Sequence, residues 1–176
     1  MTLSTRDTGA HGARRDLTSD PIRWGVAGPG GIARKVARDL VTVVDGGVLH
    51  AVGSRSLDRA EAFAAELAPE GEVRAYGSYQ ELFADPDVDV VYIATPHRQH
   101  AVLALRAIDA GKAVLVEKAF TCTLDGAQRV VDAARANGVF AMEAMWTRFQ
   151  PAVVRVRELI AQGAIGEVRS VRADLG

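Results

Sequence analysis

Gly28, Gly30 and Ala33 stand at the spacing of a phosphate-binding turn between a strand and a helix. Gly28 permits a sharp turn, Gly30 lets the backbone approach a pyrophosphate without a Cβ in the way, and Ala33 lets helix and strand pack closely. The amide groups of Gly31 and Ile32, at the start of the helix, would then face the anion. The pattern predicts a dinucleotide site.

The sequence around this turn supports the prediction. A glycine-rich turn by itself is a weak signal, because such turns are common. Here Trp24 and Val26 suit a buried strand before the turn, and Val36, Ala37 and Leu40 recur at helical spacing after it. The strand, turn and helix together indicate a nucleotide-binding unit.

The choice of cofactor is expected to depend on the residues that follow the second strand. An Asp or Glu there would bind the ribose 2′-hydroxyl of NAD and repel a 2′-phosphate. This chain has Ser54 and Arg55, whose hydroxyl and guanidinium can bind a phosphate. We therefore predict NADP, with NAD possible. In the alternative, Ser56 only caps the next helix and Arg55 is solvated, which leaves the preference undecided.

A second polar cluster follows the fourth predicted strand. It consists of Thr95, Pro96, His97 and His100. The carboxyl ends of parallel strands open onto the ligand crevice of a doubly wound sheet, so we predict that these residues contact the cofactor. In the alternative, the two histidines are solvated or only begin the following helix.

Glu117 and Lys118 end the fifth predicted strand, where two charges are unexpected after an apolar run. Lys118 could polarise a carbonyl, hold a hydroxyl or donate a proton during hydride transfer, which makes it the predicted catalytic residue. The alternative is a structural ion pair between the two side chains.

The elements that position these residues alternate between strand and helix patterns, as in a parallel sheet covered on both faces. The predicted strands are Arg23–Ala27, Val48–Val52, Val73–Tyr76, Val88–Ala94, Ala113–Val116 and Val139–Met145. The predicted longer helices are Ile32–Leu40, Leu57–Leu67, Gln99–Ala110, Leu124–Ala134 and Pro151–Ile160. Six strands with crossover helices predict an α/β Rossmann fold of order 3-2-1-4-5-6, with the fourth strand in a central position.

Local signals mark the ends of several helices. Ser78, with Glu81 three residues later, has the spacing of a capping box, and Thr123 can cap a helix in the same way. Gly111 and Gly138 suit left-handed helix ends. We expect residues 1–20 to form a disordered tail, 21–150 the dinucleotide-binding domain, and 151–176 a connecting helix with the start of a second domain.

Composition restricts the class of protein. A chain of 176 residues suggests little more than one domain, and a net charge of −1 with 48% apolar residues gives no reason to expect nucleic acid or a membrane as partner. The single Cys122 and the lack of a long apolar stretch favour the cytoplasm. The N-terminal tail has no apolar core for a secretory signal; an organelle address is the less favoured alternative. No metal site is expected.

In combination, four motifs resemble the Gfo/Idh/MocA oxidoreductases over about Ile22 to Leu175. They are the glycine turn, the run from Ala94 to His97 with His100, the pair Glu117 and Lys118, and the run from Trp146 to Phe149 with Pro151. The last motif and Glu143-Ala144 resemble the dimeric dihydrodiol dehydrogenase branch of that family.

The resemblance implies an NAD(P)-binding domain in which Glu117 and Lys118 lie at the nicotinamide end and Lys118 assists proton transfer. Arg148 matches a residue that approaches the cofactor in relatives, although it could simply be solvated. Trp146 would line the substrate space or pack against the end of the sheet. Relatives have proline after the lysine, whereas this chain has Ala119.

The resemblance also implies a second domain, which supplies most of the substrate pocket and the sheet through which subunits pair into homo-oligomers. Val168 to Ala173 corresponds to its first strand, so we expect a truncated chain that binds cofactor with little turnover. The intact enzyme would move a hydride between NADP and a small molecule, the CH–OH or C=O group of a sugar, polyol or cyclic diol. The alternative is a non-catalytic NADP-binding sensor or partner module. A methyltransferase also uses a glycine-rich first turn, but it usually needs an acidic residue after the second strand, where this chain has Ser54.

Overall fold

The computed structural model describes residues 20–68 and 73–174. Nearly all of the predicted N-terminal tail, residues 1–20, therefore lies outside the described residues, as does Leu175. The strands are β1 (Ile22–Ala27), β2 (Gly47–Gly53), β3 (Arg74–Tyr76), β4 (Val90–Ile93), β5 (Ala113–Glu117) and β6 (Ala141–Ala144). The helices are α1 (Gly31–Thr42), α2 (Leu57–Leu67), α3 (Tyr79–Ala84), α4 (His100–Asp109), α5 (Leu124–Asn137) and α6 (Pro151–Ala161), with short 3-10 helices at His97–Gln99 and Trp146–Phe149.

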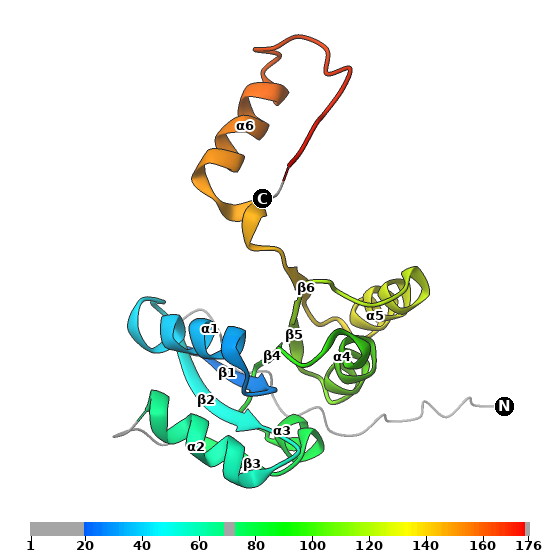
Figure 1. Cartoon of the computed structure of the whole chain (residues 1–176). Coiled ribbons are helices and arrows are strands. Elements are labelled where there is room, and N and C mark those ends of the chain that lie inside the picture. The colour runs from blue at the N-terminus through cyan, green and yellow to red at the C-terminus, as the bar shows by residue number, and fades with distance from the viewer. Residues whose placement is uncertain (1–19, 69–72, 175–176) are drawn as a thin grey trace, which may run out of the picture. The chain divides into compact units, whose positions relative to one another are not determined.

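The strands form one sheet of order β3-β2-β1-β4-β5-β6 (Figure 1). Strand β1 pairs with β2, β2 with β3, and β5 with β6, each in parallel. The prediction of a doubly wound sheet of order 3-2-1-4-5-6 is confirmed, as is the position of β4 between β1 and β5.

The chain divides into two compact units, one up to Val90 and the other from Val91. In the first unit, α1, α2 and α3 cover the strands β1 and β2 with small and branched apolar residues. Gly25 and Gly53 face this core closely, because a Cβ on either would lie within about 3 Å of Leu82 side-chain atoms. The fully or nearly buried apolar residues of this unit include Val26, Ala33, Ala37, Ala51, Val52, Ala60, Phe63, Leu82 and Val88.

The core of the second unit lies between its strands and the helices α4 and α5. Strand β4 is buried from Val91 to Ile93, as expected for a strand covered on both faces. Helix α4 presents an apolar face to the core, and α5 adds Val130 and Ala134. The other buried apolar residues are Tyr92, Leu103, Ala104, Ala107, Ile108, Val114 and Val116.

The predicted helix ends are largely confirmed. The Ser78 hydroxyl accepts the Glu81 N–H at 3.2 Å, and the Thr123 hydroxyl accepts the Gly126 N–H at 3.1 Å. Gly111 and Gly138 have φ values of 76° and 62°, in the left-handed region that favours glycine. Because these signals are local in sequence, they can be recognised without the tertiary structure.

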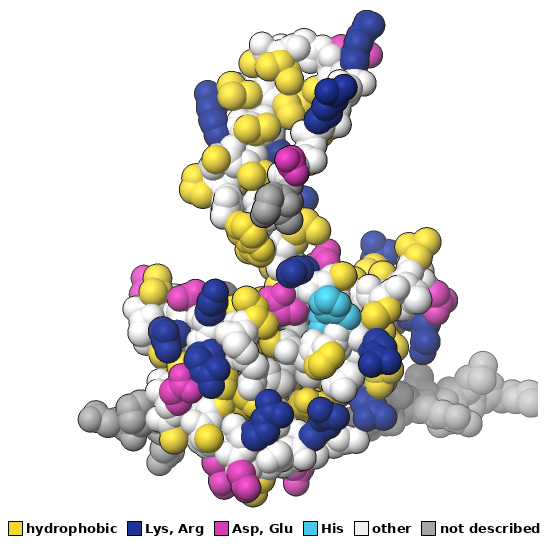
Figure 2. Space-filling view, viewed as in Figure 1, with side chains coloured by type: hydrophobic (Ala, Val, Ile, Leu, Met, Phe, Trp, Pro, Cys, Tyr) yellow, Lys and Arg dark blue, Asp and Glu magenta, His cyan; other side chains and the backbone are white. Residues whose placement is uncertain are grey.

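The C-terminal segment differs from the prediction. Residues 168–174 form no strand, and no residue from 151 to 174 is buried. A strand needs a neighbour for its backbone hydrogen bonds, and the described residues supply none to this segment. Figure 2 shows apolar side chains on the surface of α6 and the residues after it; they include Val154, Val156, Ile160, Ile165, Val168 and Val171.

Among the described residues, no helix has the length and apolar character needed to cross a membrane.

Candidate functional site

The glycine turn leaves the start of α1 open. Gly28 has a φ of 94°, and its N–H donates to the Gly53 carbonyl at 3.0 Å, which fixes the turn against the end of β2. Gly30 is the N-cap of α1, yet no side chain caps this helix, and its first turn carries no acidic residue. The first amide groups of α1 are therefore available to an anion.

Space is also available in front of this helix start. A Cβ on Gly30 would meet nothing nearer than the Gly28 carbonyl oxygen at 4.0 Å, and a Cβ on Gly31 would meet nothing within 4 Å. The fold itself thus has room for a side chain at both positions. Ala33 is fully buried, as the close packing of helix and strand requires, whereas Ile32 is 46% exposed.

Residues 54–57, directly after β2, carry no carboxylate. Ser54 is buried, its N–H donates to the Tyr76 carbonyl at 3.0 Å, and its hydroxyl accepts the Ser56 N–H at 3.3 Å. Arg55 is exposed. Ser56 occupies the N-cap of α2, but its side chain makes no capping hydrogen bond, so the alternative that it serves as a helix cap is not supported.

In the second unit, the residues after β4 include two buried polar atoms without a partner. Thr95 is only 7% exposed, and its hydroxyl oxygen has no hydrogen-bond partner among the described residues. The side-chain oxygen of Gln99 is in the same state. Buried polar atoms are normally paired, so these two indicate a place for a ligand group or water. Pro96 and His97 are exposed beside them.

His100 is placed differently from the prediction. It is fully buried, with its Nδ1 at 2.8 Å from the Ala119 carbonyl oxygen and its Nε2 at 2.7 Å from the Thr95 carbonyl oxygen. The ring also meets that of His97 edge to face, at 5.4 Å between centroids. Since both ring nitrogens already face backbone carbonyls, neither is left for a cofactor.

Glu117 and Lys118 do not form the ion pair that the alternative expected. Within the described chain, the Glu117 carboxylate instead accepts the Tyr92 hydroxyl at 2.6 Å and the backbone N–H of Lys118 at 3.0 Å. Burial, and then the hydrogen bond to Glu117, raise the pKa of the Tyr92 hydroxyl. The Lys118 side chain is exposed, and the peptide bond to Ala119 is cis.

Trp146 and Arg148 lie on the 3-10 helix that follows β6, and both are exposed, Trp146 by 60%. The alternative that Trp146 packs against the end of the sheet is therefore not supported. Sequence reasoning gave no role to Tyr92, and it used Glu143 only for the resemblance. Each is a polar residue within an otherwise apolar strand, and this pattern is the sequence signal that could have identified it.

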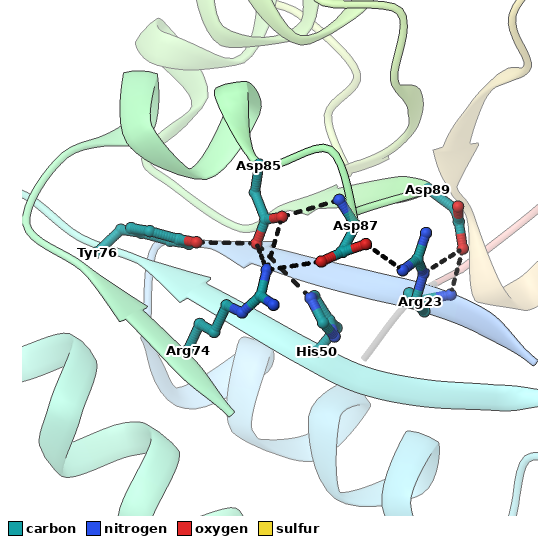
Figure 3. Close-up of polar contacts among 7 residues, drawn as sticks. All are labelled: Arg23, His50, Arg74, Tyr76, Asp85, Asp87 and Asp89. Atoms are coloured by element: carbon teal, nitrogen blue, oxygen red, sulfur yellow. Dashed lines mark hydrogen bonds and ion pairs between the residues drawn. The ribbon is translucent and has the colours of Figure 1, made fainter. Parts of the chain in front are cut away.

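The first unit also holds a charged network that sequence analysis did not anticipate (Figure 3). The buried carboxylate of Asp85 accepts the Arg74 guanidinium at 3.0 Å and the Tyr76 hydroxyl at 2.8 Å. Asp87 is bound by Arg23 at 2.6 Å and by Arg74 at 2.9 Å, and the His50 Nε2 lies 3.6 Å from Asp85.

The pKa values of this network reflect its contacts. Burial alone would raise the pKa of Asp85, but hydrogen bonds from the Asp87 N–H, the Tyr76 hydroxyl and Arg74 outweigh it and lower the pKa. Arg23 and then Arg74 lower the pKa of Asp87. His50, Asp85 and Asp87 could group around a cation, but the guanidinium groups already neutralise the carboxylates, so we assign the network to the fold.

A hollow of about 350 Å³ lies at the end of α1 and the start of β2, lined by residues 40–45 and 47–49. It is at the far end of α1 from the glycine turn. Asp45 is the one titratable residue of its lining, so it offers little chemistry.

A glycine turn between a strand and an uncapped helix, in a sheet of this order, defines a dinucleotide-binding Rossmann domain. The family model "Oxidoreductase family, NAD-binding Rossmann fold" matches residues 22–145. The chain belongs to the Gfo/Idh/MocA oxidoreductase family, which confirms the resemblance found in the sequence.

Two curated relatives are similar over 88% of the chain. One is D-xylose 1-dehydrogenase (NADP(+)) of Hypocrea jecorina, 43% identical over 162 residues. The other is trans-1,2-dihydrobenzene-1,2-diol dehydrogenase of Mus musculus, 42% identical over 160 residues. The matches cover 41% and 46% of the length of these relatives.

Among solved structures, KijD10 is similar to this chain with a TM-score of 0.74 and 35% sequence identity. It is a 3-ketoreductase from Actinomadura kijaniata, solved in complex with TDP-benzene and NADP. The match covers 85% of this chain and 46% of that one.

Proposed function

We propose that this chain binds NADP and provides the cofactor-binding part of an oxidoreductase that acts on the CH–OH or C=O group of a sugar, polyol or cyclic diol. The observation that carries the proposal is the uncapped start of α1 behind Gly28 and Gly30, with open space where Cβ atoms would stand. The names of the relatives, an NADP-dependent xylose dehydrogenase and a dihydrodiol dehydrogenase, support this substrate class.

In the first unit, the residues present fit the pyrophosphate and the 2′-phosphate of this cofactor. The first amides of α1, from Gly31 and Ile32, would bind the pyrophosphate. Arg55, supported by Ser54 at the turn, would bind the 2′-phosphate, and no carboxylate among residues 54–57 opposes it. NAD remains the second candidate, because a dinucleotide without the 2′-phosphate would use the same pyrophosphate site.

The nicotinamide end would be held by residues of the second unit. The Thr95 hydroxyl, which has no partner within the described part of the chain, supplies a hydrogen-bonding group for this end. Pro96, His97, Glu117, Lys118 and Arg148 are the further proposed contacts, and Trp146 is the proposed substrate contact. His100 is withdrawn from this set, because both of its ring nitrogens are already engaged.

Lys118 is the proposed catalytic residue. The bound nicotinamide would supply or accept the hydride at the substrate carbon. In the direction of reduction, the Lys118 ammonium donates the proton that the substrate oxygen gains, and water restores that proton to Nζ. Among the described residues, no ion pair occupies this ammonium, so it is available to a substrate oxygen.

Isothermal titration calorimetry tests the cofactor assignment. The purified chain is titrated with NADPH, NADH and adenosine 2′,5′-bisphosphate. We expect NADPH to bind at least tenfold more tightly than NADH, since a charge-assisted contact to the 2′-phosphate is worth about 1.5–3 kcal/mol. No heat with either dinucleotide would contradict the proposal. A preference for NADH would retain the site but reverse the choice of cofactor.

Oxidation of NADPH in the presence of sugars or diketones tests the reaction. Substrate-dependent oxidation that is lost in Lys118→Ala would support hydride transfer with Lys118 as the proton donor. The competing hypothesis of a non-catalytic NADP-binding module predicts binding with no such oxidation at all, whereas we expect slow oxidation from this chain. The dehydrogenase relatives do not favour the competing hypothesis.

A further inference from the structure

The backbone around Lys118 is held by side chains from three other elements. Beyond the end of β5, Lys118 and Ala119 are exposed, and the strand ladder no longer fixes their peptide groups. Three polar atoms of this short segment nevertheless have partners. They are the N–H of Lys118, the carbonyl of Ala119 and the N–H of Phe120.

The first contact runs from β4 through Glu117. The Tyr92 hydroxyl donates to Oε1 of Glu117 at 2.6 Å, and Oε2 of the same carboxylate accepts the Lys118 N–H at 3.0 Å. Tyr92 is fully buried, so its ring cannot change rotamer without disturbing the core. The carboxylate is thus held in one orientation and transmits it to the backbone of Lys118.

The second contact comes from α4. The buried His100 ring joins the Ala119 carbonyl, at 2.8 Å, to the Thr95 carbonyl, at 2.7 Å. Carbonyl oxygens only accept hydrogen bonds, so the ring nitrogen that carries the hydrogen donates to one of these two carbonyls, and the tautomer decides which. The residue after Lys118 is therefore tied to the end of β4.

The third contact comes from β6. The Glu143 Oε1 accepts the Phe120 N–H at 2.9 Å. Glu143 is half-buried in the strand next to β5, in a register that pairs it with Val116. A carboxylate in an otherwise apolar strand costs desolvation, which this hydrogen bond to the segment partly offsets.

We propose that Tyr92, His100 and Glu143 are positioning residues that act through the backbone on both sides of Lys118 and set the direction in which its ammonium leaves the sheet. Their side chains are ordered when the chain folds, so little entropy remains to be lost when the ligand binds. This inference rests on the proposed function of Lys118 at the nicotinamide end.

Paired affinities test the proposal in the full chain. Tyr92→Phe removes one hydroxyl and keeps the ring. We expect it to weaken NADPH binding about fivefold, with the affinity for adenosine 2′,5′-bisphosphate, which has no nicotinamide, changed less than about twofold. In a Lys118→Ala background, the same substitution should cause a clearly smaller loss, because most of the effect passes through Lys118.

Substitutions of His100 and Glu143 provide rescue tests. The amide of Asn can take the place of Nδ1, which contacts the Ala119 carbonyl, whereas that of Gln takes the place of Nε2, which contacts Thr95. His100→Asn should therefore retain more NADPH affinity than His100→Gln. Glu143→Gln keeps an oxygen that can accept the Phe120 N–H and should behave like wild type, whereas Glu143→Leu should resemble Tyr92→Phe. Val130→Ala, in the core of α5, is the control for lost stability without a lost contact to the segment.

A direct readout is the NMR signal of the lysine side chain, since the sequence has only Lys35, Lys112 and Lys118. NADPH should shift the Lys118 signal in wild type and shift it much less in Tyr92→Phe. Equal losses for NADPH and the bisphosphate, additive effects in the Lys118→Ala background, or the same losses in Val130→Ala would overturn the proposal. Wild type that binds neither ligand would refute the proposed function itself.

Discussion

At the scale of single residues, we expect some glycines of this chain to be required by the packing of the fold and others by the ligand. The free space around each glycine distinguishes the two groups. A Cβ on Gly53 would lie 2.9 Å from the Leu82 Cδ2, so the core requires glycine there. A Cβ on Gly30 would meet nothing nearer than the Gly28 carbonyl oxygen at 4.0 Å. The fold therefore does not require glycine at position 30, and we expect a bound pyrophosphate to be what requires it.

Gly30→Ala is expected to reduce NADPH affinity at least tenfold, because the methyl group would stand between the pyrophosphate and the first amides of α1. The free energy of unfolding, measured by thermal denaturation, should change by less than about 0.5 kcal/mol, since Gly30 has an ordinary negative φ and no close neighbours. Gly53→Ala should instead cause a clear loss of stability, because its methyl group would collide with Leu82. Unchanged affinity in Gly30→Ala would argue against the site.

Arg55→Ala is expected to weaken NADPH binding about tenfold and to leave NADH binding nearly unchanged, because only NADPH carries the 2′-phosphate. Calorimetry with both dinucleotides measures the difference. Arg59 is another exposed arginine, four residues further along the chain in α2, and Arg59→Ala is the matched control. Equal effects from the two substitutions would show a general charge effect instead of a specific contact.

At the scale of elements, the charged network joins β1, β2 and β3 to the loop between α3 and β4. Asp85 has no exposed side-chain surface, and it connects Arg74, Tyr76 and the Asp87 backbone. Removal of Arg74 or Tyr76 takes a partner from the buried Asp85 carboxylate, which costs more than a surface ion pair contributes.

This network predicts a loss of stability in acid. Burial, only partly opposed by Asp85, lowers the pKa of His50 below its ordinary 6.5. The unfolded chain therefore takes up this proton first, and stability falls as the pH drops below about 6.5 until the folded His50 also titrates. Asp85 and Asp87, whose pKa values are lowered, add a second loss below about pH 4.

Urea unfolding at about pH 7.5, 5.5 and 3.5 measures both steps. His50→Gln should remove the part of the first step that is due to His50 and leave the second in place. A wild type and a His50→Gln variant that lose the same free energy of unfolding between about pH 7.5 and 5.5 would show that the first step has another origin.

At the scale of the whole molecule, stability is concentrated in the two cores. The second unit buries most of β4 and one face each of α4 and α5, while no residue from 151 to 174 is buried. The apolar side chains of α6 therefore contribute little to folding in this chain (Figure 2). Contacts made within a core, and not apolar composition, decide which helices stabilise the fold.

Val130→Ala in α5 should cost about 2 kcal/mol, since it removes methyl groups from a fully buried site. Val156→Ala in α6, where the residue is 54% exposed, should cost less than about 0.5 kcal/mol. Chemical denaturation of the two variants gives the comparison. Amide hydrogen exchange should likewise be much faster in α6 than in α5, and equal protection in both helices would contradict this view.

Much of the fold follows from local sequence patterns. The bounds of α2 and the left-handed ends at Gly111 and Gly138 agree with the prediction, because helical periodicity and glycine conformation are properties of short segments. The strand expected at 168–173 is wrong for the described residues, since strand formation depends on a neighbour that a short segment cannot specify. For the same reason β6 is shorter than its apolar run.

By itself, the sequence determined the order of the elements, the glycine turn and the family of the chain, because these depend on spacing along a few residues or on the order of patterns. Only the tertiary structure decided that Tyr92, His100 and Glu143 meet the segment of Lys118, since their partners lie 19 to 25 residues away. Such contacts depend on how the strands and α4 pack, so no local pattern specifies them.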